Sequence, residues 1–174
     1  MEILMKKICF ILCLCIITWG FASCGTNTEV ITMEEFKNYT SIYKEEIESI
    51  DESLVINEST LVTQDGNYIT VYSIETQDHI SFGVTLTLIS EKKAELFIEF
   101  SDASENWSED NIALFAKFIS KLSKNELQFD EIKTVCNDIC QANEHRFNKN
   151  TRLFWDDYHS TLYYSEKFAI DINF

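Results

Sequence analysis

The residues best suited to chemistry gather in one segment near the C-terminus. The segment combines two carboxylates, an imidazole and aromatic rings, in Trp155, Asp156, Asp157, Tyr158, His159 and Tyr163. Paired carboxylates among aromatic rings are what a glycoside-cleaving or sugar-binding site uses, and an imidazole can serve as an acid or a base. Adjacent residues of a strand point to opposite faces, however, so Asp156 and Asp157 cannot both face one substrate. We therefore predict no catalytic residue.

The simplest interpretation of this segment is an aromatic sheet edge with solvated acids. Exposed aromatic rings at a rim are also the usual anchors of recognition, so a surface that binds a partner is expected here first. The predicted binding residues are Trp155, Asp157, Tyr158, His159 and Tyr163.

Two cysteines form the second group. Cys136 and Cys140 are four residues apart in a segment with helical periodicity, so they share a helix face with apolar residues. Thiols buried as small hydrophobes are the favoured interpretation. A disulfide between Cys136 and Cys140 is the alternative in an exported protein, although a helix holds the two α-carbons near the upper limit for bridging.

Two patterns approach a metal site without completing one. His145 follows Cys136 by nine residues, which places it on the opposite side of a continuing helix. Oxygen-bearing side chains alternate over residues 102–110 as at the start of an EF-hand loop, but Trp107 replaces its glycine and Ala113 its bidentate glutamate. The sequence also lacks a phosphate-binding loop and a nucleophile elbow. We expect no metal and no cofactor.

The N-terminal segment has the features of an export signal. Lys6 and Lys7 precede residues 8–22, an almost unbroken apolar stretch without charge. A helix needs about 20 apolar residues to cross a bilayer, and this stretch is shorter. The pattern is typical of the apolar region of a signal peptide.

The residues Phe21-Ala22-Ser23-Cys24 resemble the lipobox of bacterial lipoproteins, in which an apolar residue and two small residues precede a cysteine. Phe21 replaces the usual leucine but remains apolar, and Gly25 also fits. The resemblance implies that Cys24 is diacylglycerylated and becomes the first residue after cleavage. It places the protein at the outer face of the cytoplasmic membrane, because two acyl chains give stable anchoring. An ordinary secretory signal and a retained membrane anchor are the alternatives.

This organisation divides the chain into a signal peptide (1–23), a short tether (24–31) and a single acidic domain (32–174). The chain has 14 basic and 29 acidic residues. The signal contains Lys6, Lys7 and Glu2, so the remainder has 12 basic and 28 acidic residues and a net charge of −16. Such a charge disfavours nucleic acid and anionic lipid head groups as partners. The lipid anchor is then the expected contact with the membrane.

The pattern of the domain predicts an α+β fold. Thr32 and Glu35 fit a capping box that begins an amphipathic helix. Residues 54–100 alternate with a period of two, and residues 64–67, Gln-Asp-Gly-Asn, are a strong turn signal within them. A four-stranded antiparallel meander is predicted there. Ser108 is expected to cap the next helix.

The C-terminal part of the domain is predicted to contain a further helix and three strands. The helix covers residues 130–143, and the strands cover 152–158, 161–165 and a last segment from Phe168 to Phe174. The predicted order is α-ββββ-αα-βββ, an antiparallel sheet with helices packed on one face.

For function we expect a membrane-anchored extracytoplasmic lipoprotein that acts as a binding module, with a protein or a glycan as its partner. One alternative is a cell-envelope hydrolase that uses Asp156, Asp157 and His159. Another is an accessory subunit that docks on a membrane complex through the aromatic edge.

Overall fold

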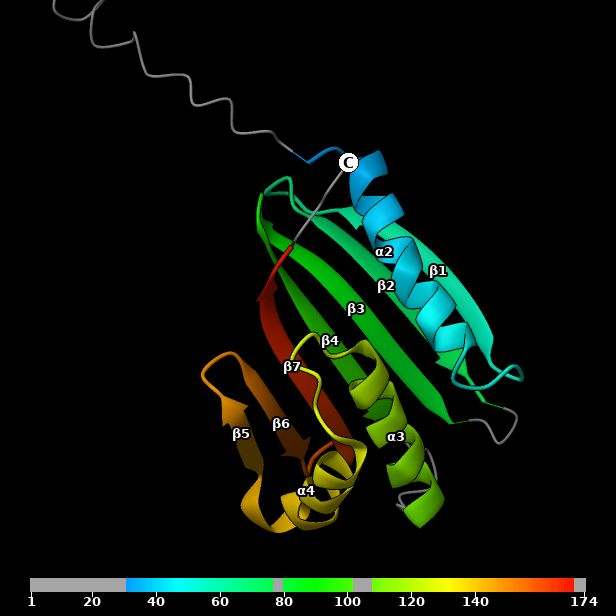
Figure 1. The fold of residues 1–174 in the computed structure, drawn as a ribbon, viewed down its shortest axis with the longest axis vertical. Coiled ribbons are helices and arrows are strands. Elements are labelled where there is room, and N and C mark those ends of the chain that lie inside the picture. The colour runs from blue at the N-terminus through cyan, green and yellow to red at the C-terminus, as the bar shows by residue number, and fades with distance from the viewer. Residues whose placement is uncertain (1–30, 77–79, 102–107, 171–174) are drawn as a thin grey trace, which may run out of the picture. The chain divides into compact units, whose positions relative to one another are not determined.

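The computed structural model describes residues 31–76, 80–101 and 108–170, without the side chain of Cys140. Within these residues, seven strands form one antiparallel sheet in the order β1-β2-β3-β4-β7-β6-β5 (Figure 1). The strands are β1 (Val55–Val62), β2 (Tyr68–Glu75), β3 (Ser81–Ser90), β4 (Lys93–Ser101), β5 (Glu144–Asn148), β6 (Thr151–Asp156) and β7 (Thr161–Ala169). The predicted four-stranded meander is confirmed as β1 to β4.

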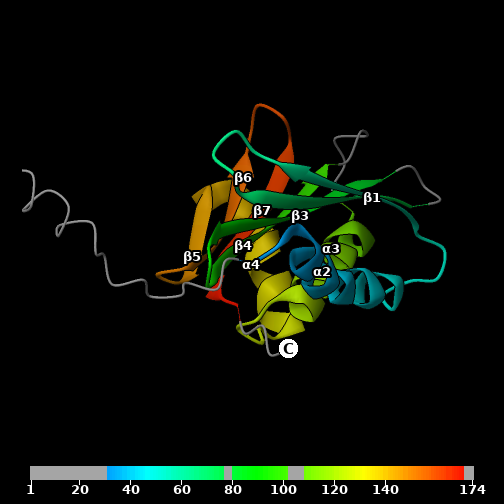
Figure 2. The same cartoon turned by 90° about the horizontal axis from the view of Figure 1, so that it is seen from above.

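Three helices lie on one side of this sheet, as Figure 2 shows. They are α2 (Met33–Glu48), α3 (Glu109–Leu122) and α4 (Phe129–Ala142). The predicted capping box is confirmed: the Glu35 N–H donates to the Thr32 hydroxyl at 3.2 Å, and the Thr32 N–H donates to the Glu35 carboxylate at 2.6 Å. Ser108 caps α3 by accepting from the Asn111 N–H at 3.1 Å. The predicted α+β class, element order and one-sided packing are confirmed.

The C-terminal strands differ from those predicted, although their number is the same. The short polar strand β5 was not predicted, and the two strands expected after residue 161 are one continuous strand, β7. Asn143 ends α4 in the left-handed conformation, and its carbonyl accepts from the Trp155 N–H at 2.9 Å. The chain therefore turns from α4 straight into β5. Phe174, expected in the last strand, lies outside the described residues.

The core lies between the helices and one face of the sheet. Alternation in the strands gives this face a continuous apolar layer. Phe82 stacks on Phe100 and on Phe118 of α3, with 4.4 Å between ring centres in both pairs. Ile31, the last residue of the expected tether, is buried against this core. Other fully buried members include Phe36, Ile47, Val84, Leu86, Leu96, Ile98, Phe115 and Ile119.

Of the two cysteines of α4, the structure describes the side chain of Cys136 only. Cys136 is 1% exposed and belongs to the core, as expected of a thiol that packs as a small hydrophobe. The side chain of Cys140 lies outside the described residues. The disulfide between Cys136 and Cys140 therefore stays a prediction.

One carboxylate is fully buried on the helix side of β7. Glu166 is 0% exposed and accepts three hydrogen bonds, from the hydroxyls of Tyr164 at 2.6 Å and Ser123 at 2.8 Å and from the Asn125 amide at 2.6 Å. Among the described residues, no lysine or arginine forms an ion pair with it. Ser123 and Asn125 belong to the loop between α3 and α4. Glu166 therefore ties this loop to the sheet.

Neutralising this carboxylate should destabilise the fold. In Glu166→Gln, an amide N–H₂ replaces an acceptor oxygen and leaves at least one of the three donors unpaired. The free energy of unfolding at pH 7 should fall by about 1–3 kcal/mol, the cost of an unsatisfied buried polar group. Urea denaturation of the purified chain measures it.

Glu99→Gln is the matched control, because Glu99 is exposed on the opposite face of the sheet. It should change the free energy of unfolding by less than about 0.5 kcal/mol. Equal effects of the two substitutions would mean that the three hydrogen bonds to Glu166 do not stabilise the fold.

Candidate functional site

The face of the sheet that the described helices leave uncovered carries a cluster of three neighbouring rings and a guanidinium group. Phe154 and Tyr163 are register partners on β6 and β7, with ring centres 4.9 Å apart and planes 16° from parallel. Phe97 on β4 lies 5.5 Å from the Tyr163 ring, and the Arg152 guanidinium lies 4.9 Å from the Phe154 ring. We call Phe97, Arg152, Phe154 and Tyr163 the aromatic–arginine stack.

The alternation of the strands explains why these side chains meet on the open face. Leu96 and Ile98, on either side of Phe97, are fully buried on the helix side, so Phe97 points away from the core. Phe97, Phe154 and Tyr163 are each half-buried, because the rings cover one another instead of being covered by a helix. The stack is an apolar surface held in place by its own contacts.

Partial burial also fixes the chemistry of the Tyr163 hydroxyl. Burial, and next the negative charge of Glu99, raise the pKa of Tyr163 above its ordinary value. The phenol therefore stays protonated at neutral pH. It can donate one hydrogen bond from the rim of the stack.

The open face is almost balanced in charge, unlike the whole chain, whose net charge is −15. Two of its ion pairs lie beside the stack: Glu144 contacts Arg146 at 2.7 Å and Arg152 at 3.6 Å. Strand parity and register assign five acidic and four basic residues to this face, namely Glu75, Glu95, Glu99, Glu144, Asp156, Lys93, Arg146, Arg152 and Lys167. The excess of acidic charge must therefore lie elsewhere on the molecule.

The structure divides the predicted binding residues between two sides of the sheet. Tyr163 is part of the aromatic–arginine stack. Trp155 is opposite Leu162 in the register and is partly buried against the core on the helix side. Trp155 and Tyr163 therefore lie on opposite faces of the sheet, because neighbouring strand residues alternate between faces. The same rule brings Phe154, which was not predicted, to the face of Tyr163.

Asp157, Tyr158 and His159 lie in the turn between β6 and β7 and are exposed. The Asp156 carboxylate holds this turn, since it accepts from the Tyr158 N–H at 2.9 Å and from His159 Nδ1 at 2.8 Å. Tyr158, 88% exposed, packs edge-on against the His159 ring. Both Asp156 oxygens are thus engaged in shaping the turn, a structural use of the residue.

The members missed by sequence reasoning were Phe97, Arg152 and Phe154. Each lies at a solvent-facing position of an alternating strand, where a polar side chain is usual. An aromatic ring at such a position was the signal that could have identified Phe97 and Phe154. Their contact with Tyr163 also required the order β4-β7-β6, which is set by pairing between distant segments.

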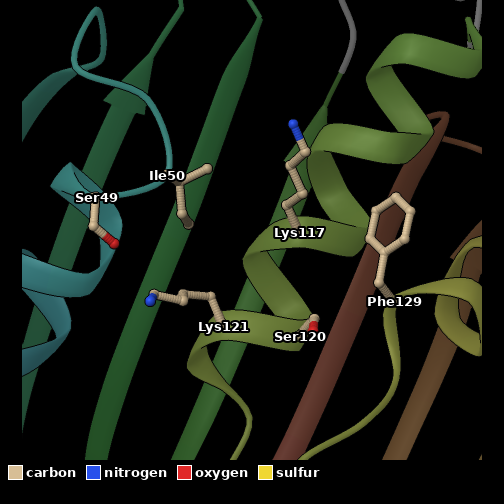
Figure 3. Close-up of a pocket in the computed structure, with 6 residues that line it drawn as sticks. All are labelled: Ser49, Ile50, Lys117, Ser120, Lys121 and Phe129. Atoms are coloured by element: carbon tan, nitrogen blue, oxygen red, sulfur yellow. The ribbon is translucent and has the colours of Figure 1, made fainter.

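A hollow of about 420 Å³ lies between the end of α2 and α3, lined by Ser49, Ile50, Lys117, Ser120, Lys121 and Phe129 (Figure 3). Figure 3 shows Lys121 extending from α3 toward Ser49. Its ammonium group contacts the Glu46 carboxylate at 2.9 Å. A neighbouring carboxylate thus offsets one of the two positive charges, which makes the hollow a weaker candidate than the open face.

No three histidine, cysteine or acidic side chains gather as a metal site in the part of the chain that the structure describes. Within the same residues, each helix is too short or too polar to cross a membrane. Cys24 and residues 102–107 lie outside the described residues. The chain matches no known protein family, no curated protein and no solved structure.

The turn contact between Asp156 and His159 should be visible in a titration. The hydrogen bond from His159, and next that from the Tyr158 N–H, lower the pKa of Asp156 from its ordinary 3.8. His159→Ala should raise it toward 3.8. The stability that the ionised Asp156 carboxylate supplies is present above its pKa in the unfolded chain. It is lost as the pH falls through the lower pKa of Asp156 in the folded chain.

Carboxyl carbon shifts followed by NMR between about pH 2 and pH 6 measure this pKa. His145→Ala on β5 is the control, because His145 is exposed and its ring packs against Phe147. An Asp156 pKa that stays unchanged in His159→Ala would contradict the proposed role of the imidazole.

Proposed function

We propose that this chain is an extracytoplasmic lipoprotein, anchored through acylated Cys24, that binds a protein partner on the aromatic–arginine stack. The observation that carries the proposal is the stack itself, three rings and a guanidinium group on a sheet face that no described helix covers. Aromatic residues and arginine are the types enriched where protein interfaces concentrate their binding energy.

The geometry of the stack favours a protein over a glycan. A sugar ring binds by lying on an open aromatic face. Here the Phe154 and Tyr163 rings face one another, only 16° from parallel, and the Arg152 guanidinium lies over the Phe154 ring. A protein side chain can instead pack against ring edges and the Arg152 stem.

Charge supports the same choice. The open face is close to neutral, so a partner can cover it without stranding many unpaired carboxylates. The Tyr163 hydroxyl and the ion pairs around Glu144 can supply polar contacts at the rim. The strong acidity of the rest of the molecule keeps it soluble and discourages other contacts.

The lipobox-like residues 21–24 support the anchor. With a net charge of −16, the part of the chain after the signal is repelled by anionic head groups, so stable residence at a membrane needs a covalent lipid. A tethered binding module then meets partners that share the membrane surface.

Site-specific crosslinking tests the binding surface. A photoreactive phenylalanine analogue, p-benzoylphenylalanine, placed at position 163 of the full chain should give a discrete adduct with one other protein on irradiation of the cells that make it. The same analogue at Ser73, exposed on the same face at the other end of the sheet, should not. Denaturing gels and mass spectrometry identify the adduct.

The crosslinking result has a clear contrary outcome. Absence of a protein adduct at position 163, or equal adducts at positions 163 and 73, would mean that the stack is not a protein-binding surface. Phe154→Ala in the position-163 variant should lower the adduct yield several-fold, because position 163 then loses its stacking neighbour.

Cys24→Ser tests the anchor separately. The hydroxyl cannot form the thioether to diacylglycerol, so the chain should remain an unprocessed precursor without the mass of a lipid adduct. Intact-mass analysis of the membrane fraction measures this, and Cys15→Ser in the signal is the matched control. Normal processing and lipid mass in Cys24→Ser would remove the anchor from the proposal and leave the stack untouched.

A further inference from the structure

The two edges of the sheet differ in their protection against pairing with another strand. Figure 1 shows β5 at one margin and β1 at the other. Strand β5 has five residues, shifts register between Arg146 and Asn148, and lies beside α4. Strand β1 has eight residues and pairs with β2 without a shift. Short length, irregularity and cover are the usual defences of an edge, and among the described residues β1 has none of them.

Strand β1 also exposes aliphatic side chains. Val55, Leu61 and Val62 are 58%, 56% and 53% exposed, and they make up half of the six large hydrophobic residues exposed in the described part of the chain. The strand contains neither lysine nor proline, and its one charged residue is Glu58. A regular edge with exposed aliphatic residues is a template for another strand.

The backbone of β1 shows which groups are available. The Thr63 N–H donates to the Asn67 carbonyl at 2.9 Å, so Thr63 directs its backbone groups toward β2. Residues of a strand alternate in this direction. Ile56, Glu58, Thr60 and Val62 therefore direct their N–H and C=O groups outward, where no described element pairs with them.

We propose that β1 pairs antiparallel with β1 of a second copy of this chain, around a twofold axis at Ser59. In this register Ser59 faces its own copy, Glu58 faces Thr60, and Ile56 faces Val62. Each outward backbone group then has a partner, and two seven-stranded sheets become one. Such an interface is self-complementary and closed, as a stable dimer requires.

The neighbouring registers are less favourable. A shift by one pair in one direction places Glu58 opposite Glu58 of the second copy, and like charges directly opposed destabilise a strand pair. A shift in the other direction places Glu58 opposite Val62. In the proposed register, Ile56, already packed against the core, meets Val62 and extends the apolar layer. Lys44 lies 3.6 Å from Glu58 and offsets its charge.

This self-complementarity is the reason to choose a second copy as the occupant. A foreign strand needs a matching sequence of its own, whereas β1 reversed already places Ile56 opposite Val62 and Glu58 opposite Thr60, with no like charges opposed. Pairing with β1 of the second copy also covers two exposed side chains, Val62 on the helix side and Leu61 on the open side.

Disulfide trapping tests the register. In the proposed dimer, Ser59 and its copy form a non-hydrogen-bonded pair with α-carbons about 4.5 Å apart, within reach of a disulfide. Ser59→Cys in the purified full chain should therefore give several times more disulfide-linked dimer than the wild type on mild oxidation, measured on non-reducing gels. The wild type sets the background of the native cysteines.

Asn57→Cys and Ser73→Cys are the matched controls, because both positions are exposed on the same face as Ser59 but not on the axis. Both should stay near the wild-type yield. Equal dimer yields in all three variants, or no dimer above background in Ser59→Cys, would overturn the proposal. So would a dominant Glu58→Cys dimer, which indicates a different register.

A second pair of variants separates pairing from folding. Val62 is more than half exposed, so Val62→Lys should not disturb the monomer, but it places a charge opposite Ile56 of the second copy. Added to Ser59→Cys, it should abolish the dimer, whereas Ser73→Lys should preserve it. Persistence of the dimer in the Val62→Lys background would contradict pairing through β1.

Discussion

The constraint that governs this protein is that, in the described part of the chain, the helices cover only one face of a seven-stranded sheet. Side-chain alternation gives every strand one face toward α2, α3 and α4 and one toward solvent. The covered face can be filled with large aliphatic and aromatic residues, whereas the open face must keep its rings shielded by each other. Side chains on the open face are therefore not packed against a described helix, and the register of the strands sets how they are arranged.

Strand β7 contributes side chains both to the buried face of the sheet and to the aromatic–arginine stack on the open face. It lies between β4 and β6, with Tyr164 and Glu166 toward the helices and Tyr163 toward the stack. Burial raises the pKa of Tyr39 in α2, and the negative charge of Glu166 raises it further, so this carboxylate also acts on α2. A shift of β7 by one residue in its register would move each of its side chains to the opposite face of the sheet. Because Glu166 is satisfied only in the native register, the contacts that hold the α3–α4 loop also place Tyr163 beside Phe97 and Phe154.

What could be predicted from the sequence was local. The Thr32–Glu35 capping box, the turn at residues 64–67 and the period of two in residues 54–100 each depend on neighbours along the chain, and each is present in the structure. Strand β5 escaped prediction because its polar residues show no alternation, so only pairing with β6 makes it a strand. The site escaped for a related reason: Trp155 and Tyr163 are close in sequence but lie on different faces, whereas Phe97 meets Tyr163 only through the pairing of β4 with β7.

The two proposed surfaces are compatible because the sheet keeps them apart. The stack occupies β4, β7 and β6, and two strands, β2 and β3, separate it from the β1 edge. Pairing of β1 with its copy therefore leaves both stacks uncovered. Paired residues of an antiparallel ladder point to the same face, so the open faces of the two copies would be directed to the same side. A partner that is itself twofold could then engage both stacks, and the second contact would form at a high effective concentration. The proposed lipid tether would favour the same assembly, since it would confine the copies to one surface and raise their encounter rate without any new contact between them.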